Sequence, residues 1–449
     1  MNKYIERVLE ETRAKNATEP EFLQTVEEVL TSLAPVIDQH PEYEEAALLE
    51  RMVEPERVIE FRVVWEDDNH KPHVNRGYRV QYNSAIGPYK GGLRFHPSVN
   101  LSVIKFLGFE QTFKDALTTL PMGGAKGGSD FDPRGKSDRE IMRFCQAFMH
   151  GLWQFIGPEI DCPAGDLGVG AREIGYMYGE YRRIKTKSEN VALTGKGLAF
   201  GGSLVRPEAT GYGAVYYLES VLAHEGDTIV GKTIAASGFG NVCWGICKKA
   251  AELGAKVVTL SGPDGYIYDP EGVATPEKID FLLQMRSSGR DKVQDYADKF
   301  GCQFVAGEKP WGVKADIIMP SATQNDVNME QAKKIAANGI KYYIEVANMP
   351  TTNDALRFLM EQEGMIVAPS KAVNAGGVSV SGLEMTQNFE HLSWTAEEVD
   401  AKLHQIMTEI HDSSAAAAER YGLGYNLVAG ANIVGFQKVA DAMMAQGWT

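Results

Sequence analysis

The chain has 449 residues, of which 44% are hydrophobic and 23% charged, and this composition excludes a mostly disordered chain, a collagen and a coiled coil. Asp and Glu (60) outnumber Lys and Arg (45), so the net charge of −15 disfavours non-specific binding to nucleic acid. No apolar run approaches the roughly 18 residues of a membrane helix, and no signal-peptide core is present. Five cysteines without framework spacing argue against a disulfide-stapled secreted protein. We expect a cytoplasmic enzyme or scaffold protein, without a membrane or nucleic-acid partner.

The first part of the chain predicts helices followed by a hairpin. Apolar residues recur at helical spacing up to about residue 60. The alternating, β-branched stretch from Val58 to Trp65 predicts a strand. A polar turn, EDDNHKPH, separates it from a second strand, GYRVQYNSA. The two strands are expected to pair antiparallel. Dividing the length by a typical domain of roughly 150 residues predicts about three domains, and two larger ones fit equally well.

The second half of the chain predicts a parallel, doubly wound sheet. A segment from Leu193 to Thr210 is expected to cross between domains, and a helix follows over Tyr212–His224. Next come a strand, a glycine turn, a helix and a second strand at Val257–Leu260, which together form a βαβ unit. Further strands are expected in ADIIMPSA, KYYIEVAN and MIVAPS, and the C-terminal part of the chain is expected to be helical.

The turn of this βαβ unit contains a dinucleotide-binding fingerprint. It has the form G-x-G-x-x-C from Gly238 to Cys243, with a small Cys where Gly or Ala is usual. The first Gly permits a tight turn, the second permits approach of a pyrophosphate, and the helix that follows presents its N-terminus to the phosphates. A glycine-rich turn without a nucleotide is the alternative.

Cofactor choice depends on the end of the second strand. Asp264 follows it and would reach a ribose hydroxyl, as NAD requires. No Arg or Lys in GPDGYIYD is available to meet a 2′-phosphate. The sequence therefore favours NAD over NADP, unless Arg290 or Lys292 folds back to bind a phosphate.

Three lysines and one aspartate stand close to glycine-rich segments in the first half of the chain. They are Lys90 in YKGGLR, Lys114 in QTFKDAL, Lys126 in GGAKGG and Asp166 in PAGDLGVG. Glycines flanking a lysine would let a substrate come close, and burial near other cations would lower the pKa of the amine. Asp166 would be its acid/base partner, and clustered cations suit a substrate with more than one carboxylate. The alternatives are solvated surface lysines and a turn-forming aspartate.

No metal site is predicted. Asp130, Asp132 and Gly135 lie in a calcium-loop-like segment that lacks the further ligands and is interpreted as a turn. Cys243 and Cys247 have no second Cys or His pair at zinc spacing. The histidines lack an HExxH pattern, and the absence of a P-loop motif excludes a P-loop NTPase.

Several blocks, in order, closely resemble the hexameric glutamate dehydrogenases, above all the bacterial, clostridial NAD-dependent type. They are YKGGLRFHPSVN, LPMGGAKGGSDFDPRGKSDRE, PAGDLGVGAREIGYMYGEYRR, the GFGNV turn and KAVNAGGVSVSGLE, and the likeness spans essentially the whole chain. The resemblance implies reversible oxidative deamination of L-glutamate to 2-oxoglutarate and ammonia. The chain departs from the family pattern at Cys243 and in the Lys185–Asn190 stretch, and neither departure has an evident consequence for the chemistry.

The resemblance also implies roles for individual residues. Lys126 matches the catalytic lysine and Asp166 the acid/base. Lys114 and Gln111 match residues that bind the α-carboxylate, and Lys90 with Ser381 matches the pair that holds the distal carboxylate. Other positions expected at the substrate are Gly91, Arg206 and Val378. The positions expected at the cofactor are Thr210, Gly238, Phe239, Gly240, Asn241, Val242, Pro263, Asp264, Ala322, Asn348 and Asn374.

The family architecture implies two α/β domains separated by a cleft, assembled into a homohexamer. A substrate-binding and oligomerisation domain is expected over residues 1–201, joined by a C-terminal helix at 425–449, and a Rossmann-like domain with hinge helices over 202–424. A related dehydrogenase of apolar amino acids is a second hypothesis, which Lys90 argues against because its buried amine would be left unpaired. An NADP-dependent glutamate dehydrogenase and an inactive scaffold on the same fold are the others.

Overall fold

The computed structural model describes residues 2–447, which form two compact units. The first unit comprises residues 2–206, 380–399 and 432–447, and the second comprises residues 207–379 and 400–431. Each unit contains one sheet covered by helices, so the predicted α/β class is confirmed. No helix in residues 2–447 combines the length and the apolar character needed to cross a membrane.

The first unit is built on a five-stranded sheet in the order β1-β2-β4-β3-β5. The predicted hairpin is confirmed, with Val64 directly opposite Val74. Its turn is held by Asp67, whose carboxylate accepts hydrogen bonds from the backbone N–H groups of Asn69 and Lys71 at 2.8 and 2.9 Å. β3 lies parallel to both β4 and β5. The strands are β1 (Arg57–Glu66), β2 (Pro72–Asn83), β3 (Tyr89–Phe95), β4 (Gly123–Ser129) and β5 (Asp161–Gly165).

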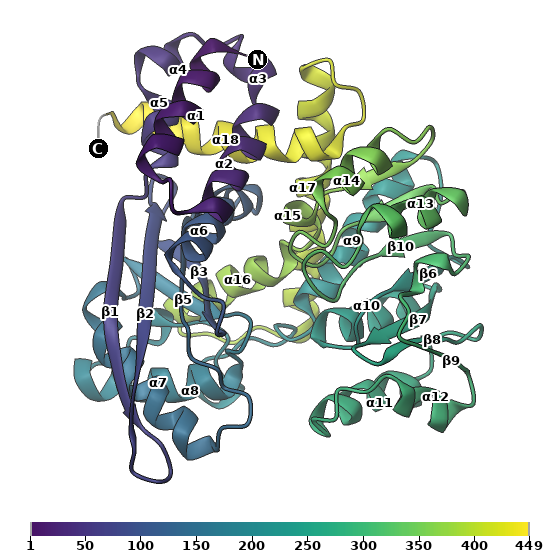
Figure 1. Ribbon diagram of the computed structural model, residues 1–449, viewed down its shortest axis with the longest axis horizontal. Coiled ribbons are helices and arrows are strands. Elements are labelled where there is room, and N and C mark those ends of the chain that lie inside the picture. The colour runs from purple at the N-terminus through teal and green to yellow at the C-terminus, as the bar shows by residue number, and fades with distance from the viewer. Residues whose placement is uncertain (1, 448–449) are drawn as a thin grey trace. The chain divides into compact units, whose positions relative to one another are not determined.

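Helices bury the faces of this sheet. Phe95 on β3 packs edge-on against Phe144 and Phe148 of α7, with ring centroids 5.0 and 5.2 Å apart. The end of the chain returns beside the N-terminal helices (Figure 1), where Asn432 Nδ2 donates to Ser32 Oγ at 2.9 Å. The helices are α1 (Lys3–Lys15), α2 (Pro20–Ser32), α3 (Ala34–Ile37), α4 (Glu42–Glu45), α5 (Leu48–Val53), α6 (Leu101–Leu117), α7 (Asp138–Leu152) and α8 (Ala171–Lys185).

The glycines around Lys126 serve chain packing, which corrects the expectation that they make room for a substrate. Every residue of β4 is buried. A Cβ added at Gly124 would lie 2.1 Å from Thr112 Oγ1 of α6, and one added at Gly127 would lie 2.7 Å from Leu93 Cδ2. Real Cβ atoms do not approach this closely, so the glycines let α6 and the neighbouring strands press against β4. The physical reason is close backbone packing inside the protein.

The second unit has a seven-stranded sheet in the order β12-β11-β10-β6-β7-β8-β9. The strands from β12 to β7 are parallel, as predicted, but β8 and β9 pair antiparallel, which the sequence did not indicate. The reason is the turn at Gly262–Gly265, which folds the chain back on β7, with Gly265 at a φ of +144°. The strands are β6 (Thr233–Ala236), β7 (Lys256–Gly262), β8 (Gly265–Tyr268), β9 (Gln303–Ala306), β10 (Ile317–Met319), β11 (Tyr342–Ile344) and β12 (Ile366–Ala368).

The chain reverses its winding direction between β6 and β10, which are neighbours in the sheet although more than eighty residues separate them. Ser237, after β6, joins them: its Oγ accepts from Ser321 N and Ala322 N, at 3.0 and 3.2 Å. Such a switch point opens a crevice at the carboxyl ends of the strands.

The helices of the second unit cover this sheet, and α11 and α12 lie at its β8–β9 end (Figure 1). They are α9 (Ala209–His224), α10 (Asn241–Glu252), α11 (Pro276–Ser287), α12 (Gln294–Phe300), α13 (Met329–Ala337), α14 (Asn353–Met360) and α15 (Ser370–Val373). Three C-terminal helices, α16 (Gly376–Glu390), α17 (Ala396–Arg420) and α18 (Leu427–Gln446), contribute residues to both units. Four short 3₁₀ segments are Trp153–Phe155, Asn190–Ala192, Leu198–Phe200 and Pro310–Gly312.

Candidate functional site

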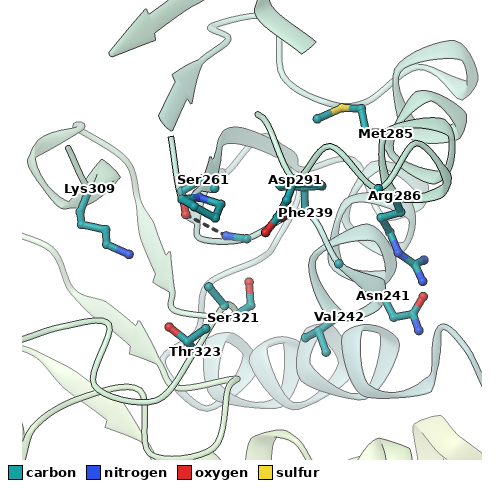
Figure 2. Close-up of a pocket in the computed structure, with 16 residues that line it drawn as sticks. Phe239, Asn241, Val242, Ser261, Met285, Arg286, Asp291, Lys309, Ser321 and Thr323 are labelled. Carbon is teal, nitrogen blue, oxygen red and sulfur yellow. Dashed lines mark hydrogen bonds between the residues drawn. The ribbon is translucent and has the colours of Figure 1, made fainter. Parts of the chain in front are cut away.

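A cavity of about 650 Å³ opens at the carboxyl ends of β6, β7 and β10 in the second unit (Figure 2). Its position at the switch point is where nucleotides bind in open α/β sheets, and its volume lies in the range of ligand sites, roughly 300–1,000 Å³. The lining residues are Gly238, Phe239, Gly240, Asn241, Val242, Ser261, Gly262, Pro263, Met285, Arg286, Gly289, Asp291, Lys309, Ser321, Ala322 and Thr323.

The glycine turn of the fingerprint has the geometry of a phosphate-binding turn. Gly238 adopts a φ of +82°, and its N–H donates to Ser261 Oγ at 2.9 Å. A Cβ at Gly240 would meet no atom within 4 Å, so space for a ligand adjoins this residue. Gly240 is also the N-cap of α10, whose free N–H groups favour an anion. Cys243 is buried in the third position of the fingerprint.

The cavity gathers seven of the eleven residues expected at the cofactor. Four stay outside its lining: Thr210 on α9, Asp264, Asn348 and Asn374. The Asp264 carboxylate accepts hydrogen bonds from Val293 N and Gln294 N, at 3.0 and 3.1 Å, at the start of α12. Asn374 Nδ2 donates to Asn348 Oδ1 at 2.8 Å. The buried Asn374 Oδ1 has no hydrogen-bond partner within residues 2–447.

The cations at the cavity differ from those considered from the sequence. Arg290 pairs with Asp295 at 3.0 Å, and neither Arg290 nor Lys292 lines the cavity. Arg286 and Lys309 line it instead, and Figure 2 shows Arg286 beside Asn241 with Lys309 at the other end. Lys309 Nζ pairs with a buried Asp326 carboxylate at 2.6 Å. Arg286 reaches the cavity because the fold packs helix α11 beside it, and no local sequence pattern indicates that packing.

The first unit brings Lys126 and Asp166 together, although they lie 40 residues apart in the chain. Lys126 Nζ is 3.3 Å from Asp166 Oδ2, and Arg94 Nε donates to the same oxygen at 2.8 Å. Burial raises the pKa of Asp166, but the opposing effect of Lys126 and Arg94 is larger and holds it well below the ordinary value. Burial lowers the pKa of Lys126, opposed by Asp166. The pair therefore carries an ionised carboxylate beside an amine that releases its proton readily.

Lys114 lies near this pair on the last turns of α6. Burial lowers its pKa to about 8, and the charge of Lys126 contributes. Its Nζ makes no hydrogen bond or ion pair with any described residue, so its protons are available to a ligand. Gln111, one turn earlier, donates from Nε2 to Asp115 Oδ1 at 2.6 Å. Burial raises the pKa of Asp115 well above its usual range.

Lys90 and Ser381 lie in the same unit without a hydrogen bond between them. Lys90 is fully buried, and its Nζ donates to Cys162 O at 2.9 Å and to Thr194 Oγ1 at 2.8 Å. An ammonium has three donors, so one remains for a ligand. Ser381 Oγ accepts from Arg206 Nε at 3.0 Å. Burial lowers the pKa of Lys90, as does the charge of Arg206.

The two remaining residues expected at the substrate are Gly91 and Val378. A Cβ at Gly91 would lie 1.7 Å from the carbonyl oxygen of Ala125, so strand packing requires this glycine. Val378, on the first turn of α16, is half-buried and belongs to the second unit.

Besides the unpredicted residues of the cavity, two residues of the first unit were not predicted from the sequence. Arg94 lies four positions after Lys90 on β3, and the period of two of a strand puts both side chains on one face. That alternation was the available signal. Thr194, the acceptor for Lys90, lies in a loop with no such signal. No group of three or more His, Cys, Asp or Glu within residues 2–447 is arranged to hold a metal ion.

Comparison with known proteins places the chain in a family. The family model described as "Glutamate/Leucine/Phenylalanine/Valine dehydrogenase" matches residues 201–447, and "Glu/Leu/Phe/Val dehydrogenase, dimerisation domain" matches residues 55–183. The chain is 78% identical over 447 residues to the "NAD-specific glutamate dehydrogenase" of Clostridium symbiosum, covering 100% of this chain and 99% of that protein. It is 59% identical over 448 residues to the "NAD-specific glutamate dehydrogenase" of Bacteroides fragilis, covering 99% of each.

The fold agrees with these sequence matches. A solved structure of a "glutamate dehydrogenase" superposes with a TM-score of 0.99 at 78% identity, covering 99% of each chain. The chain therefore belongs to the Glu/Leu/Phe/Val dehydrogenase family, and the dehydrogenase model of that family covers all of the second unit.

Proposed function

We propose that this protein catalyses the reversible oxidative deamination of L-glutamate to 2-oxoglutarate and ammonia, with NAD as the hydride acceptor. The observation that carries the proposal is the Lys126–Asp166 pair, 3.3 Å apart, with two further lysines, Lys90 and Lys114, buried in the same unit. A substrate with two carboxylates needs two cationic anchors beside an acid/base pair. The names of the relatives in Clostridium symbiosum and Bacteroides fragilis support the same activity.

The anchors divide between the two carboxylates of glutamate. Lys114 binds the α-carboxylate, because its ammonium makes no bond to the described protein, and Gln111 assists. Lys90 uses its third N–H on the distal carboxylate, and Ser381, held by Arg206, donates its hydroxyl proton there. An apolar side chain would leave the Lys90 ammonium buried without its third partner.

Lys126 and Asp166 carry the proton transfers. The ionised Asp166 accepts a proton from the substrate nitrogen as hydride leaves the α-carbon, which yields an imine. Lys126, in its neutral form, removes a proton from water as the oxygen attacks the imine carbon. In its protonated form it stabilises the oxygen of the resulting carbinolamine, from which ammonia departs. Asp166 returns its proton to the nitrogen, which departs as ammonia, and the carbinolamine hydroxyl loses its proton to give the carbonyl of 2-oxoglutarate. With glutamate entering as its ammonium, each turnover consumes one water and releases two protons to solvent: the proton that Lys126 took from water and the hydroxyl proton.

The second unit fits the cofactor. The open space beside Gly240 and the N-terminus of α10 suit the pyrophosphate, and Pro263 and Phe239 wall the cavity that would hold the adenosine half. The unpartnered Asn374 Oδ1 suits the carboxamide N–H of a nicotinamide, with Asn348 fixing its orientation and Thr210 near by on α9. When bound, NAD supplies the hydride acceptor. NADP is the alternative, and Arg286 is the cation that would meet its 2′-phosphate.

We further propose that the protein assembles into a homo-oligomer, most simply a hexamer, in the cytoplasm. The dimerisation description of residues 55–183 supports an oligomer. So do exposed Val58, Val64 and Val74 on the β1–β2 hairpin, whose outer strand pairs with no other described strand. All five cysteines are free thiols, as a reducing compartment requires.

The test is absorbance at 340 nm with purified protein, L-glutamate and NAD, run in parallel with NADP and with L-leucine. We expect turnover with glutamate and NAD, and loss of nearly all of it in Lys126→Met. Preference for leucine would replace the proposal with an apolar amino-acid dehydrogenase, and preference for NADP would change the cofactor alone. Folded protein without any turnover would indicate a scaffold.

A further inference from the structure

A fully buried ion pair joins two elements of the substrate pocket in the first unit. Lys196 Nζ lies 2.7 Å from Glu384 Oε1, and both side chains are 0% exposed. The other oxygen, Oε2, accepts from Gly195 N at 2.9 Å. Lys196 Nζ also donates to Leu193 O. Glu384 therefore holds the loop 193–197 against helix α16 by both its backbone and its lysine.

The two joined elements each carry a group of the side-chain pocket. The loop carries Thr194, whose Oγ1 accepts from Lys90 Nζ at 2.8 Å. Helix α16 carries Ser381, three residues before Glu384 and so on the same helix face. Ser381 Oγ in turn accepts from Arg206 Nε at 3.0 Å. The distance between Lys90 and the Ser381–Arg206 group thus depends on the contact between Glu384 and the loop 193–197.

Stability alone does not explain why an ion pair is buried between these two elements. Two well-packed apolar side chains in this place would be as stable or more stable, because burying two charges has a large desolvation cost. What an ion pair adds over apolar packing is a fixed distance and direction between the two backbones, since three donors converge on one carboxylate. A pocket that must match one substrate length needs such a fixed distance.

We propose that Lys196 and Glu384 are positioning residues that set the depth of the side-chain pocket, and hence the preference for a five-carbon dicarboxylic amino acid over shorter or apolar ones. The inference rests on the proposed glutamate dehydrogenase activity. Neither residue contacts substrate. The pair acts through Thr194 and Ser381, so it governs where the distal carboxylate is gripped and leaves the Lys126–Asp166 chemistry in place.

The test uses two variants of the full-length protein: the charge-free double variant Lys196→Met with Glu384→Gln, and Glu384→Asp, which keeps the charge and shortens its reach. The readouts are kcat and KM for L-glutamate, L-aspartate and L-norvaline, with NADH affinity measured separately. We expect KM for glutamate to rise about 10- to 100-fold, as a displacement of about 1 Å would cause. We expect kcat, the turnover of norvaline and the affinity for NADH to change less than KM for glutamate does.

A matched control separates positioning from stability. Lys105, which is buried, and Glu19, which is half-buried, form another ion pair in the same unit, with Nζ and Oε2 2.5 Å apart, far along α6 from Lys114. Lys105→Met with Glu19→Gln should lower the thermal midpoint while leaving the glutamate-to-norvaline ratio of kcat/KM unchanged. If the Glu384 variants fold and change that ratio by less than twofold, the inference is overturned. If only one of them folds, its ratio decides. An unmodified enzyme without glutamate turnover would instead overturn the proposed function.

Discussion

At the scale of single residues, Asp166 is the group whose environment does most to define the chemistry. One of its oxygens contacts both Lys126 and Arg94, so the carboxylate is ionised and fixed in direction. The sequence indicated Lys126 and Asp166 through their glycine-rich surroundings. For Arg94 the sequence offered only the strand alternation that puts it on one face with Lys90, and an arginine within a strand is interpreted as a surface residue until the facing elements are known.

Replacing Arg94 by Met should move the acid limb of the pH profile. Arg94 helps to hold the pKa of Asp166 low, so its loss raises that pKa and Asp166 becomes protonated at a higher pH. We expect the acid limb of kcat/KM for glutamate to move to higher pH. Arg134→Met is the control, since Arg134 lies at the surface and pairs with no carboxylate other than Asp132 within residues 2–447. An unmoved acid limb in Arg94→Met would contradict the role given to Asp166.

The titration of Lys114 should set the alkaline limb of the pH profile of kcat/KM for glutamate. Its pKa of about 8 means that its positive charge is present below that pH and is lost as the pH rises through it. The α-carboxylate then loses its anchor, so kcat/KM for glutamate should fall above about pH 8. Lys114→Arg keeps the positive charge at alkaline pH. Its kcat/KM should be lower than that of the unmodified protein, but it should stay constant to a higher pH. The measurement is kcat/KM from pH 6 to 10; an alkaline limb that stays in place in Lys114→Arg would assign it to another group.

At the scale of elements, the glycines sort into those that serve packing and those that adjoin a ligand. Gly124 and Gly240 belong to equally suggestive glycine-rich motifs, and local sequence does not separate them. The structure does, because a Cβ at Gly124 would collide with Thr112 and one at Gly240 would meet nothing. The β7–β8 hairpin is a similar case: a GPDG turn was visible in the sequence, but its effect on strand direction followed only from the pairing.

These two glycines give opposite predictions for alanine variants. Gly124→Ala should lower the free energy of unfolding by about 1–3 kcal/mol or more, because α6 and β4 must separate. Gly240→Ala should lower it by less than about 1 kcal/mol, the cost of Ala at an N-cap. Its NADH affinity should nevertheless fall about tenfold or more, the contribution of one hydrogen bond to a charged phosphate. Chemical denaturation and NADH fluorescence titration measure both, and equal NADH affinity in Gly240→Ala would argue against a pyrophosphate at this turn.

At the scale of the whole molecule, the β1–β2 hairpin exposes apolar side chains that contact with a second chain would bury. Val64 and Val74 lie opposite one another and are 48% and 66% exposed. An exposed edge strand with β-branched residues is normally covered or charged. Here neither device is present at this pair, which agrees with the dimerisation description of the matching family model.

The variant Val64→Lys with Val74→Glu should reduce the size of the assembly. The opposite charges keep a favourable cross-strand pair, so the hairpin itself is retained, while a charged edge resists a second copy. For the unmodified protein we expect a sedimentation mass near six times the 49.3 kDa of one chain. The double variant should sediment as a smaller species. Val230→Lys, at an exposed site of the second unit, should sediment as the unmodified protein does. An unchanged mass in the double variant would place the interface elsewhere.

The sequence by itself determined the α/β class, the hairpin and the fingerprint turn, because each of these follows from a local pattern or from a motif shared with a family. The roles given to the lysines stay predictions. The functional division near residue 201 stays a prediction. Only the tertiary structure decided that Arg94 and Lys126 share one oxygen of Asp166, that Asp264 accepts from the backbone at the start of α12, and that Arg286 and Lys309 line the cavity. The physical reason is that a charged side chain takes whichever partner the fold brings within about 3 Å, and that partner lies tens of residues away in the chain.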